Sequence, residues 1–410
     1  MEINKDMLRK YAKLSVATGT NIQKDQILVV RSPIECADFT RLIVEEAYSL
    51  GAKEVVVHWN DEECTKLKYL HSPMEVMESF PDWLSESMLY YAKKGAAFLS
   101  ISASNPELLK DVDSKKIAAA QKSSRIANKE FSERTMTNKN AWSIIALPTA
   151  GWATKVFPTL SKEDAIAKLW NEIFKIVRVD KDDPVAAWNE HKMSLVKKMD
   201  ELNSKNYKAL HFKNSIGTDL VVTLVPNHRW VGGAEFTPEG VEFIANMPTE
   251  EIFSMPSRDG VNGKVVSTKP LNYGGTLIEN FCLTFKDGAV IEFDAEKGYD
   301  SLKELLDTDE GSRRLGEVAL VPFDSPISNS NIIFFNTLYD ENASCHLAFG
   351  NAYELCMEGV EGMTKEEKKA KGVNESLVHV DFMIGSSDLI IDGIGFDDSI
   401  TPIFRNGNWA

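Results

Sequence analysis

The stretch QILVVRSPIECADFTRLIVEEAYSLGAKEVVVHWN, residues 26–60, predicts the fold class of the first half of the chain. It opens and closes on short apolar runs, residues 26–32 and 54–60, that are typical of buried strands. The segment between them has apolar residues at the three-to-four spacing of a helix face, and Gly51 is suited to end that helix. These apolar residues are Phe39, Leu42, Ile43, Ala47 and Leu50. A strand, a helix and a second strand in this order form the unit from which parallel α/β sheets are built.

Two further apolar runs continue this alternation, AAFLSIS at residues 96–102 and WSIIALP at residues 142–148. Ser161, followed three residues later by Asp164, predicts the start of a long amphipathic helix. We therefore expect residues 1–180 to form an α/β domain with a mainly parallel sheet. Neither G-x-G-x-x-G nor a P-loop lysine motif occurs in the sequence. The expected role of this domain is therefore architectural, and it helps to enclose an active site carried elsewhere.

The second half of the chain has a different pattern. Residues 181–205 predict a connecting helix, and strand-like runs follow it. The runs are DLVVTLVP (219–226), GTLIENFCLTFKDGAVIEFDAE (275–296) and SNIIFFNTLYD (330–340), with KDG as a turn signal. A β-rich α+β domain over residues 206–410 is therefore expected. The length of 410 residues agrees with two domains, since one hydrophobic core rarely serves so long a chain.

The composition excludes several classes of partner. Lys and Arg number 46 against 61 Asp and Glu, and the resulting net charge of −15 repels nucleic acid and anionic membrane surfaces. The sequence has no apolar run of the about 18 residues that a membrane span requires. Its first residues lack the pattern of a signal peptide. The five cysteines are odd in number and lack C-x-x-C spacing, which favours a reducing, cytoplasmic location.

Polar residues interrupt one of the apolar runs in the second half. In LVHVDFM, residues 377–383, His379 and Asp381 are two positions apart. Side chains at i and i+2 of a strand point to the same face, with Cα atoms about 6.5 Å apart. An imidazole and a carboxylate are therefore expected to enter one pocket together.

Other acids and imidazoles occur in comparable apolar surroundings of the same domain. The candidates are Glu250 and Glu251 in NMPTEEIFSMP, Glu317 in LGEVALVP, and Glu341, His346 and Tyr353 in YDENASCHLAFGNAY. Taken singly, a buried histidine or tyrosine is more often a packing residue than a site residue. Taken together, buried carboxylates need positive counter-charges, and few Lys or Arg lie near them in the sequence. A metal ion supplies that charge most simply.

The mixture of ligands indicates which metals fit. Imidazole with carboxylate suits Zn, Co, Mn or Fe better than Mg or Ca. Three or four carboxylates with two imidazoles exceed the three protein ligands of a usual catalytic zinc. Two ions that share a bridging carboxylate account for this number of ligands better than one ion does. Such ions lie about 3.5–4 Å apart and activate a shared water for hydrolysis.

Three alternatives use the same residues. Cys345 precedes His346, but adjacent residues of a strand face opposite ways, which argues against a Cys–His nucleophile. The set His346, His379 and Asp381 could form the two-His–one-carboxylate iron triad of an oxygenase, which leaves the glutamates without a role. The protein could also be a non-catalytic, metal-dependent peptide-binding protein.

Four segments, in order, resemble the metal-site segments of the thermophilic aminopeptidase T family, which includes the bacterial aminopeptidases AmpS and PepS. They are NMPTEEIFSMP (246–256), LGEVALVP (315–322), YDENASCHLAFGNAY (339–353) and HVDFMIG (379–385). The ending PIFRNGNWA (402–410) also resembles the C-terminus of that family, so the likeness spans the whole chain. It implies a metal-dependent aminopeptidase, an exopeptidase that hydrolyses the N-terminal peptide bond of short peptides with a free N-terminus.

The resemblance also implies roles for individual residues. The metal-ligand positions of the family fall on Glu251, Glu317, Glu341, His346, His379 and Asp381, and its active-site tyrosine falls on Tyr353. Two divalent ions per chain are expected, Zn, Co or Mn, with Glu317 as the bridge and the Tyr353 hydroxyl as a donor to the oxyanion. Glu250 or Glu341 is expected to carry a proton to the leaving amine. A homodimer is implied as well.

Overall fold

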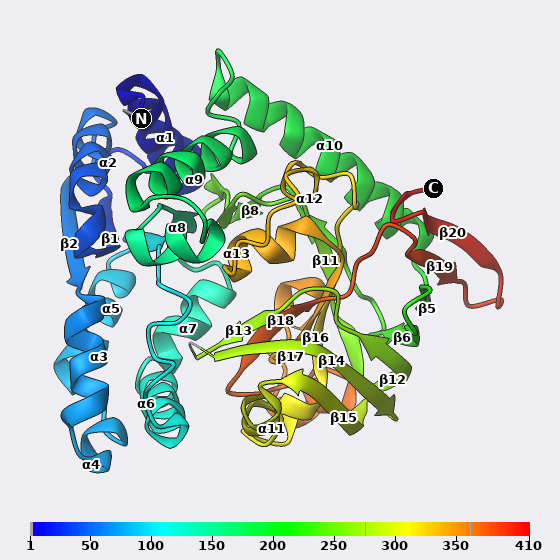
Figure 1. The fold of residues 1–410 in the computed structure, drawn as a ribbon. Helices are drawn as coiled ribbons and strands as arrows, with labels where there is room; N and C mark the ends of the chain where they lie inside the picture. Colours follow the sequence, from blue (N-terminus) through cyan, green and yellow to red (C-terminus); the bar gives the residue numbers. More distant parts are fainter. Residues whose placement is uncertain (1–2, 275, 361) are drawn as a thin grey trace. The chain divides into compact units, whose positions relative to one another are not determined.

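The computed structural model describes residues 3–274, 276–360 and 362–410, and the chain divides into two compact units (Figure 1). The first unit comprises the chain up to Lys192 together with Ala234–Thr249. The second comprises Met193–Gly233 and Glu250–Ala410, and α10 (Pro184–Lys205) spans the first crossing between the units. The chain thus returns to the first unit before it completes the second, a return that the predicted division did not contain.

The first unit is built on a five-stranded parallel sheet, as the sequence predicted. Its strand order is β10-β4-β3-β1-β2, and every neighbouring pair is parallel. The strands are β1 (Ile27–Pro33), β2 (Glu54–Asn60), β3 (Ala97–Ser102), β4 (Trp142–Ala146) and β10 (Asn246–Met247). The first four coincide with the predicted apolar runs. β10 comes from the returning segment, in which β8 (Glu235–Phe236) and β9 (Glu242–Phe243) form a short hairpin.

Helices cover both faces of this sheet. They are α1 (Lys5–Leu14), α2 (Ala37–Ser49), α3 (Glu62–His71), α4 (Met74–Met77), α5 (Asp82–Lys93), α6 (Ser114–Ala127), α7 (Lys129–Met136), α8 (Ala150–Val156) and α9 (Lys162–Ile176). The chain passes from β1 to β2 through α2 and then back across β1 to β3 through α5. Because such crossovers are right-handed, α2 and α5 lie on opposite faces. Met88 of α5 and Phe131 of α7 pack against Val29 and Phe98 of the sheet.

The residues predicted to begin α9 and to end α2 do so, but one residue predicted on the buried face of α2 is exposed. At the start of α9, the backbone N–H of Asp164 donates to Oγ of Ser161 over 3.2 Å. Gly51 follows α2 with a φ of 95°, a left-handed conformation that glycine adopts without strain. Leu50, which was predicted on the buried face of α2, is exposed because the helix ends at Ser49.

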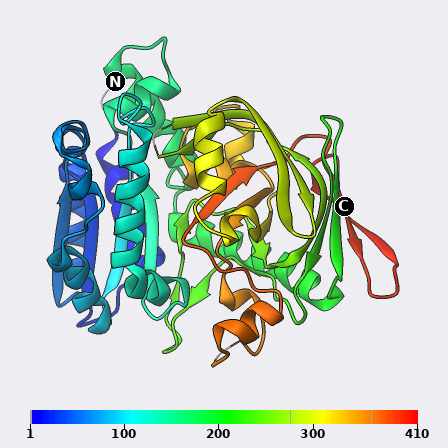
Figure 2. The ribbon, with the colours of Figure 1, turned by 90° about the horizontal axis from the view of Figure 1, so that it is seen from below.

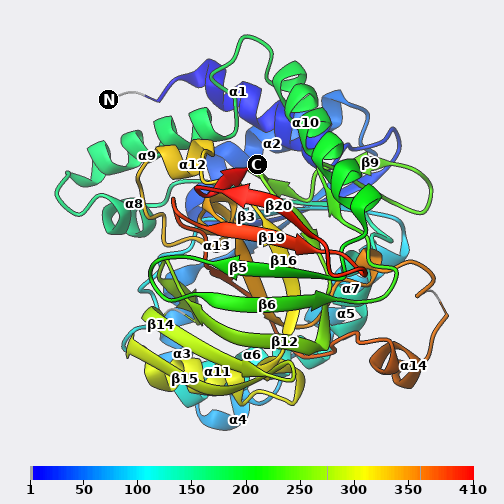
Figure 3. The same cartoon turned by 90° about the vertical axis from the view of Figure 1, so that its right-hand side faces the viewer.

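The second unit contains two antiparallel sheets. The larger, seen face-on in Figure 3, has β5 and β6 in its middle. Its strands are β5 (Ala209–Lys213), β6 (Asp219–Leu224), β12 (Pro256–Val266), β13 (Leu271–Tyr273), β14 (Thr276–Lys286), β15 (Ala289–Lys297), β19 (Ile390–Ile394), β20 (Ile400–Arg405) and β21 (Asn408–Trp409). The smaller consists of β18 (His379–Met383), β17 (His346–Gly350), β16 (Leu315–Leu320), β11 (Ile252–Ser254) and β7 (Val231–Gly232), in this order.

One hydrophobic core joins these two sheets. It contains Phe212 of β5 and Phe281 of β14 together with Leu347 of β17 and Phe382 of β18. α11 (Tyr299–Leu306) packs against β14 and β15 at the edge of this core (Figure 2). Every residue of β16 and of β17 is buried. A charged side chain on either strand therefore needs a partner inside the protein.

The predicted strand over residues 330–340 is wrong. Residues 330–336 join the short helices α12 (Pro326–Asn329) and α13 (Thr337–Asp340), the rest of the stretch is α13 itself, and no part of it forms a ladder. The carboxylate of Asp340 accepts hydrogen bonds from the backbone N–H groups of Phe334 and Asn336, at 3.0 and 3.1 Å. Phe335 between them has a φ of 54°, which a strand does not permit. A side chain therefore takes the backbone donors that a neighbouring strand would have used.

The second unit also contains α14 (Lys365–Ala370), within the charged run that follows residue 363. At 22 residues, α10 is the longest helix described, and charged residues recur along its whole length. Within the described ranges, no helix combines the length and hydropathy that crossing a membrane requires.

Replacement of Phe212 by alanine is expected to destabilise the second unit. The side chain is fully buried in the shared core, and such truncations cost about 3–5 kcal/mol. Phe396, in the turn after β19, is 69% exposed, so Phe396→Ala should change the free energy of unfolding by less than about 0.5 kcal/mol. Urea unfolding followed by circular dichroism measures both variants, and equal midpoints would contradict the description of the core.

Candidate metal centre

Three neighbouring strands of the smaller sheet present candidate residues on one face. β16 carries Glu317, β17 carries His346, and β18 carries both His379 and Asp381. In the register, Ala348 of β17 pairs with Glu317 on one side and with Asp381 on the other. Strand alternation brings the two histidines to this same face. His379 Nε2 lies 3.5 Å from Asp381 Oδ1, so the pair expected from LVHVDFM does meet.

The residue in the middle of this face is an alanine. Ala348 is fully buried, and the register places it between Glu317 and Asp381 of the neighbouring strands. A longer side chain would fill the volume in which the polar groups converge. The sequence analysis did not single out Ala348, because one alanine within an apolar strand carries no signal of its own.

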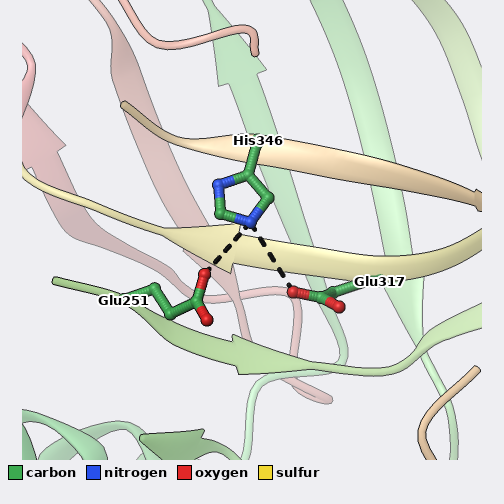
Figure 4. Close-up of side chains that lie close together, drawn as sticks. All are labelled: Glu251, Glu317 and His346. Atoms are coloured by element: carbon green, nitrogen blue, oxygen red, sulfur yellow. Dashed lines mark ion pairs between the residues drawn. The ribbon is translucent and has the colours of Figure 1, made fainter. Parts of the chain in front are cut away.

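Glu251 reaches the same face from the other side of β16. It immediately precedes β11, which pairs with β16. Figure 4 shows His346 close to two carboxylates, with its Nε2 3.2 Å from Glu251 Oε2 and 3.7 Å from Glu317 Oε1. The second oxygen of Glu317, Oε2, lies 3.2 Å from His379 Nε2. Glu317 therefore has one carboxylate oxygen toward each imidazole.

Two groups of potential metal ligands result from this geometry. One consists of Glu251, Glu317 and His346, and the other of Glu317, His379 and Asp381. Within each group the ligand atoms lie within 4.8 Å of one another. Nitrogen and carboxylate oxygen atoms at this spacing could hold a zinc-like ion. Glu317 is the residue that the two groups share.

Backbone carbonyl groups set the orientation of both imidazoles. His346 Nδ1 lies 3.0 Å from the carbonyl oxygen of Glu341 and 3.2 Å from that of Ser344. His379 Nδ1 lies 2.7 Å from the carbonyl oxygen of Asn351. Since a carbonyl only accepts, each Nδ1 must carry the proton and donate it. In the neutral imidazole, Nε2 then keeps a lone pair directed at the carboxylates, as a metal ligand requires.

The pKa values reflect the competition between burial and pairing. Burial alone would lower the pKa of both histidines, but the carboxylates around them raise it well above the usual value. For His346 these carboxylates are Glu251 and Glu317. For His379 they are Asp381 and Glu317. Burial opposes ionisation of Glu317, yet the two imidazoles beside it lower its pKa. For Glu251 burial prevails and its pKa is raised. In the described part of the chain, the ion pairs of these carboxylates run to imidazoles and not to Lys or Arg.

The remaining candidates lie next to the two groups but outside them. Glu341 is buried, and burial followed by the charges of Asp381 and Glu251 raises its pKa well above the usual value. Glu250 is also buried, and its backbone N–H donates to Oδ1 of Asn342 over 2.7 Å. The sequence analysis did not single out Asn342, since no motif marks an asparagine whose partners are mostly backbone groups.

Tyr353 lies against one of the imidazoles. Its ring centroid is 4.7 Å from that of His379 with the planes at 69°, and 5.6 Å from that of Phe253. The half-buried tyrosine therefore has its ring at the edge of the second ligand group.

Cys345 faces away from this arrangement. Its buried Sγ contacts the backbone N–H and carbonyl of Val321, at 3.4 and 3.3 Å. Burial raises the pKa of the thiol to about 12, so the thiolate needed for nucleophilic attack is not formed near neutral pH.

A known protein family and known proteins match this chain along almost its whole length. The family described as thermophilic metalloprotease (M29) matches residues 4–409. Aminopeptidase AmpS of Bacillus subtilis (strain 168) is 53% identical over 403 residues, which cover 98% of this chain and 98% of that protein.

Two solved structures are similar to this one. Wild-type AmpT from Thermus thermophilus superimposes with a TM-score of 0.92 at 43% identity, over 99% of both chains. The 2,5-dihydroxypyridine dioxygenase of Pseudomonas putida KT2440 gives a TM-score of 0.54 at 11% identity, over 99% of this chain and 96% of that one. At that identity the second likeness concerns the fold alone.

The thermal stability of the metal-free protein should fall as the pH rises. The raised pKa of His346 and His379 makes their protonated forms stabilising. This contribution is complete below the ordinary histidine pKa of about 6.5 and is lost as the pH rises through the raised values. Added Zn²⁺ binds through the Nε2 lone pairs that carry the protons of the charged histidines, so the increase in Tm that it causes should grow as the pH rises above about 6.5. Scanning fluorimetry measures both trends, and a zinc effect independent of pH would contradict the geometry.

Replacement of Ala348 by leucine should prevent metal binding without unfolding the sheet. The added atoms would occupy the space between Glu317 and Asp381, whereas the strand retains an apolar residue. Equilibrium dialysis with Co²⁺ measures the loss, and circular dichroism checks the fold. Ala289→Leu, at the start of β15 in the larger sheet, is the control and should bind as the wild type does. Normal cobalt binding by Ala348→Leu would show that this face is not the binding site.

Proposed function

Because the chain belongs to the thermophilic metalloprotease family M29, it is a hydrolase of peptide bonds, and we propose that it removes the N-terminal residue of short peptides with the help of two divalent metal ions. The position of Glu317 carries this proposal, since one oxygen of its buried carboxylate faces each of two imidazoles. The similar proteins AmpS and AmpT are named aminopeptidases, which supports the reaction.

The donor set fits two such ions. One would be held by Glu251, Glu317 and His346, and the other by Glu317, His379 and Asp381, with Glu341 as a further ligand. Imidazole nitrogen with carboxylate oxygen suits Zn, Co or Mn. The carboxylates of the two groups are buried or half-buried, and divalent cations would offset their charge.

The residues of the chain would then divide the work of hydrolysis. Bound divalent ions supply an activated water and polarise the scissile carbonyl group. Tyr353, which lies against His379, would donate a hydrogen bond from its hydroxyl to the developing oxyanion. Glu341 has a raised pKa and suits the transfer of a proton to the leaving amine, with Glu250 as the alternative carrier.

We also propose that the protein is a homodimer, as the family resemblance implied. One chain has a mass of 45.8 kDa, so light scattering on the purified protein should give about twice that value. A mass of one chain at micromolar concentration would contradict the dimer.

The reaction is tested by stripping the protein with a chelator and adding back Zn, Co or Mn. Hydrolysis of leucyl-p-nitroanilide should disappear with the metal and return with it, with a plateau near two ions per chain. N-acetyl-leucyl-p-nitroanilide should not be cleaved, because an aminopeptidase requires a free α-amino group. Glu317→Gln should lose both activity and metal, whereas Glu292→Gln, exposed on β15, is the matched control and should keep both.

The two alternative functions give different results in the same experiment. Reconstituted protein that binds peptides tightly and cleaves none of a broad panel would be a metal-dependent peptide-binding protein. Turnover that requires dioxygen and Fe²⁺ would identify an oxygenase.

Replacement of Tyr353 by phenylalanine should lower kcat and leave metal binding intact. Removal of one oxyanion donor costs about 10²–10³-fold in kcat, and the remaining ring still packs against His379. Steady-state kinetics at saturating metal measures the effect. An unchanged kcat, with chemistry rate-limiting, would remove Tyr353 from the proposed mechanism.

A further inference from the structure

We infer that Asn342 is a positioning residue of the proposed metal site, because its buried side-chain amide joins the segment that carries Glu251 to the turn that orients His346. The inference rests on the proposed function. It concerns how the chain keeps two ligands of one group in place, and not a contact with substrate.

The contacts of Asn342 use both ends of its amide. The side chain is fully buried in the short helical turn Glu341–Ala343. Its Oδ1 accepts a hydrogen bond from the backbone N–H of Glu250 over 2.7 Å. Its Nδ2 donates to the carbonyl oxygen of Leu338 over 3.0 Å and to Oε1 of Glu341 over 3.4 Å. Only an amide at this position supplies an acceptor and two donors together.

The segment with Glu250 and Glu251 needs such a partner because the ladder of β11 stops before it. The last pair between β11 and β16 is Ile252 with Leu320. Beyond Leu320, the backbone N–H and carbonyl of Val321 are engaged by the sulfur of Cys345. Asn342 Oδ1 therefore accepts from a backbone N–H that lies two residues beyond the last pair of this ladder.

The other end of the amide holds the turn that orients His346. Nδ2 of Asn342 bonds to Leu338 in α13, which fixes the turn that follows this helix. The carbonyl group of Glu341, in the same turn, accepts from Nδ1 of His346. The side chain of Asn342 thus links two backbone segments. One leads into Glu251, and the other carries the carbonyl group that orients the imidazole of His346. His346 Nε2 and Glu251 Oε2 lie only 3.2 Å apart, so a small shift of either side chain changes the geometry of their ligand group.

Two substitutions of Asn342 test the contributions of its acceptor and of its donors. Asn342→Ala removes the acceptor and both donors. Asn342→Asp has nearly the same shape and can still accept from Glu250, but it loses the donors and sets a further carboxylate beside Glu341. Both variants should therefore loosen the position of Glu251 and His346, and the aspartate variant does so while it keeps an acceptor for the N–H of Glu250.

The matched control is a buried asparagine of the first unit. Asn140 donates from Nδ2 to the carbonyl oxygens of Ala92 and Ala96 and accepts at Oδ1 from Arg134. It is 2% exposed, and none of the candidate ligands is among these partners. Asn140→Ala should lower Tm while the metal affinity stays within about twofold of the wild type.

The experiment measures the Zn²⁺ affinity of metal-free protein by competition with a chelator of known affinity. Removal of residues that orient metal ligands typically weakens metal binding about 10–100-fold, and this loss is expected for Asn342→Ala and Asn342→Asp. Tm of each metal-free variant is measured in parallel. If the Asn342 variants lose Tm as Asn140→Ala does but bind zinc as tightly as the wild type, Asn342 is only structural and the inference is wrong.

The wild-type measurement distinguishes failure of this inference from failure of the proposed function. If wild-type protein binds no zinc, the proposed metal site itself is wrong. If it binds two ions and the Asn342→Asp variant binds them equally well, only the positioning role of Asn342 is lost.

Discussion

Glu317 is a buried carboxylate with one oxygen facing the Nε2 atom of each of two imidazoles, and the ligand face of the second unit is organised around this interaction. Burial alone would favour the neutral acid, but the two histidines reverse that preference and lower its pKa. The neighbouring carboxylates of Glu251 and Asp381 face the same imidazoles. Three carboxylates and two imidazoles cannot be tolerated in a core unless each has a partner, so the positions of the strands that carry them are tightly constrained.

The strands meet this constraint by separating polar from apolar residues. On β18, His379 and Asp381 point to the ligand face, whereas Phe382 points to the other face and stacks on Phe349 of β17 with ring centroids 4.5 Å apart. The ligand face lies on one side of the smaller sheet, and the shared hydrophobic core lies on the other. The apolar residues between the ligands thus fix the register that brings the ligands together.

The parts of this arrangement that follow local rules were predictable from the sequence. Strand alternation alone predicted that His379 and Asp381 share a face, and the strand–helix–strand pattern predicted the parallel sheet. The rest depends on residues far apart in the chain. Nothing near Ala348 indicates that it lies between two carboxylates, and nothing near Asn342 indicates its bond to Glu250. The apolar run at residues 330–340 misled the prediction because Asp340 takes its backbone donors.

The three crossings of the chain between the units, at residues 192–193, 233–234 and 249–250, mean that neither unit corresponds to one continuous stretch of the gene. A fragment that ends at Lys192 would lack β10 and expose the edge of β4 to pairing with other chains. A fragment that starts at Met193 would carry β10 without its sheet. Recombination that exchanges one unit for a foreign one would need three correct joints at once. Evolution can therefore vary the two units residue by residue far more easily than it can swap them, and they should be inherited together.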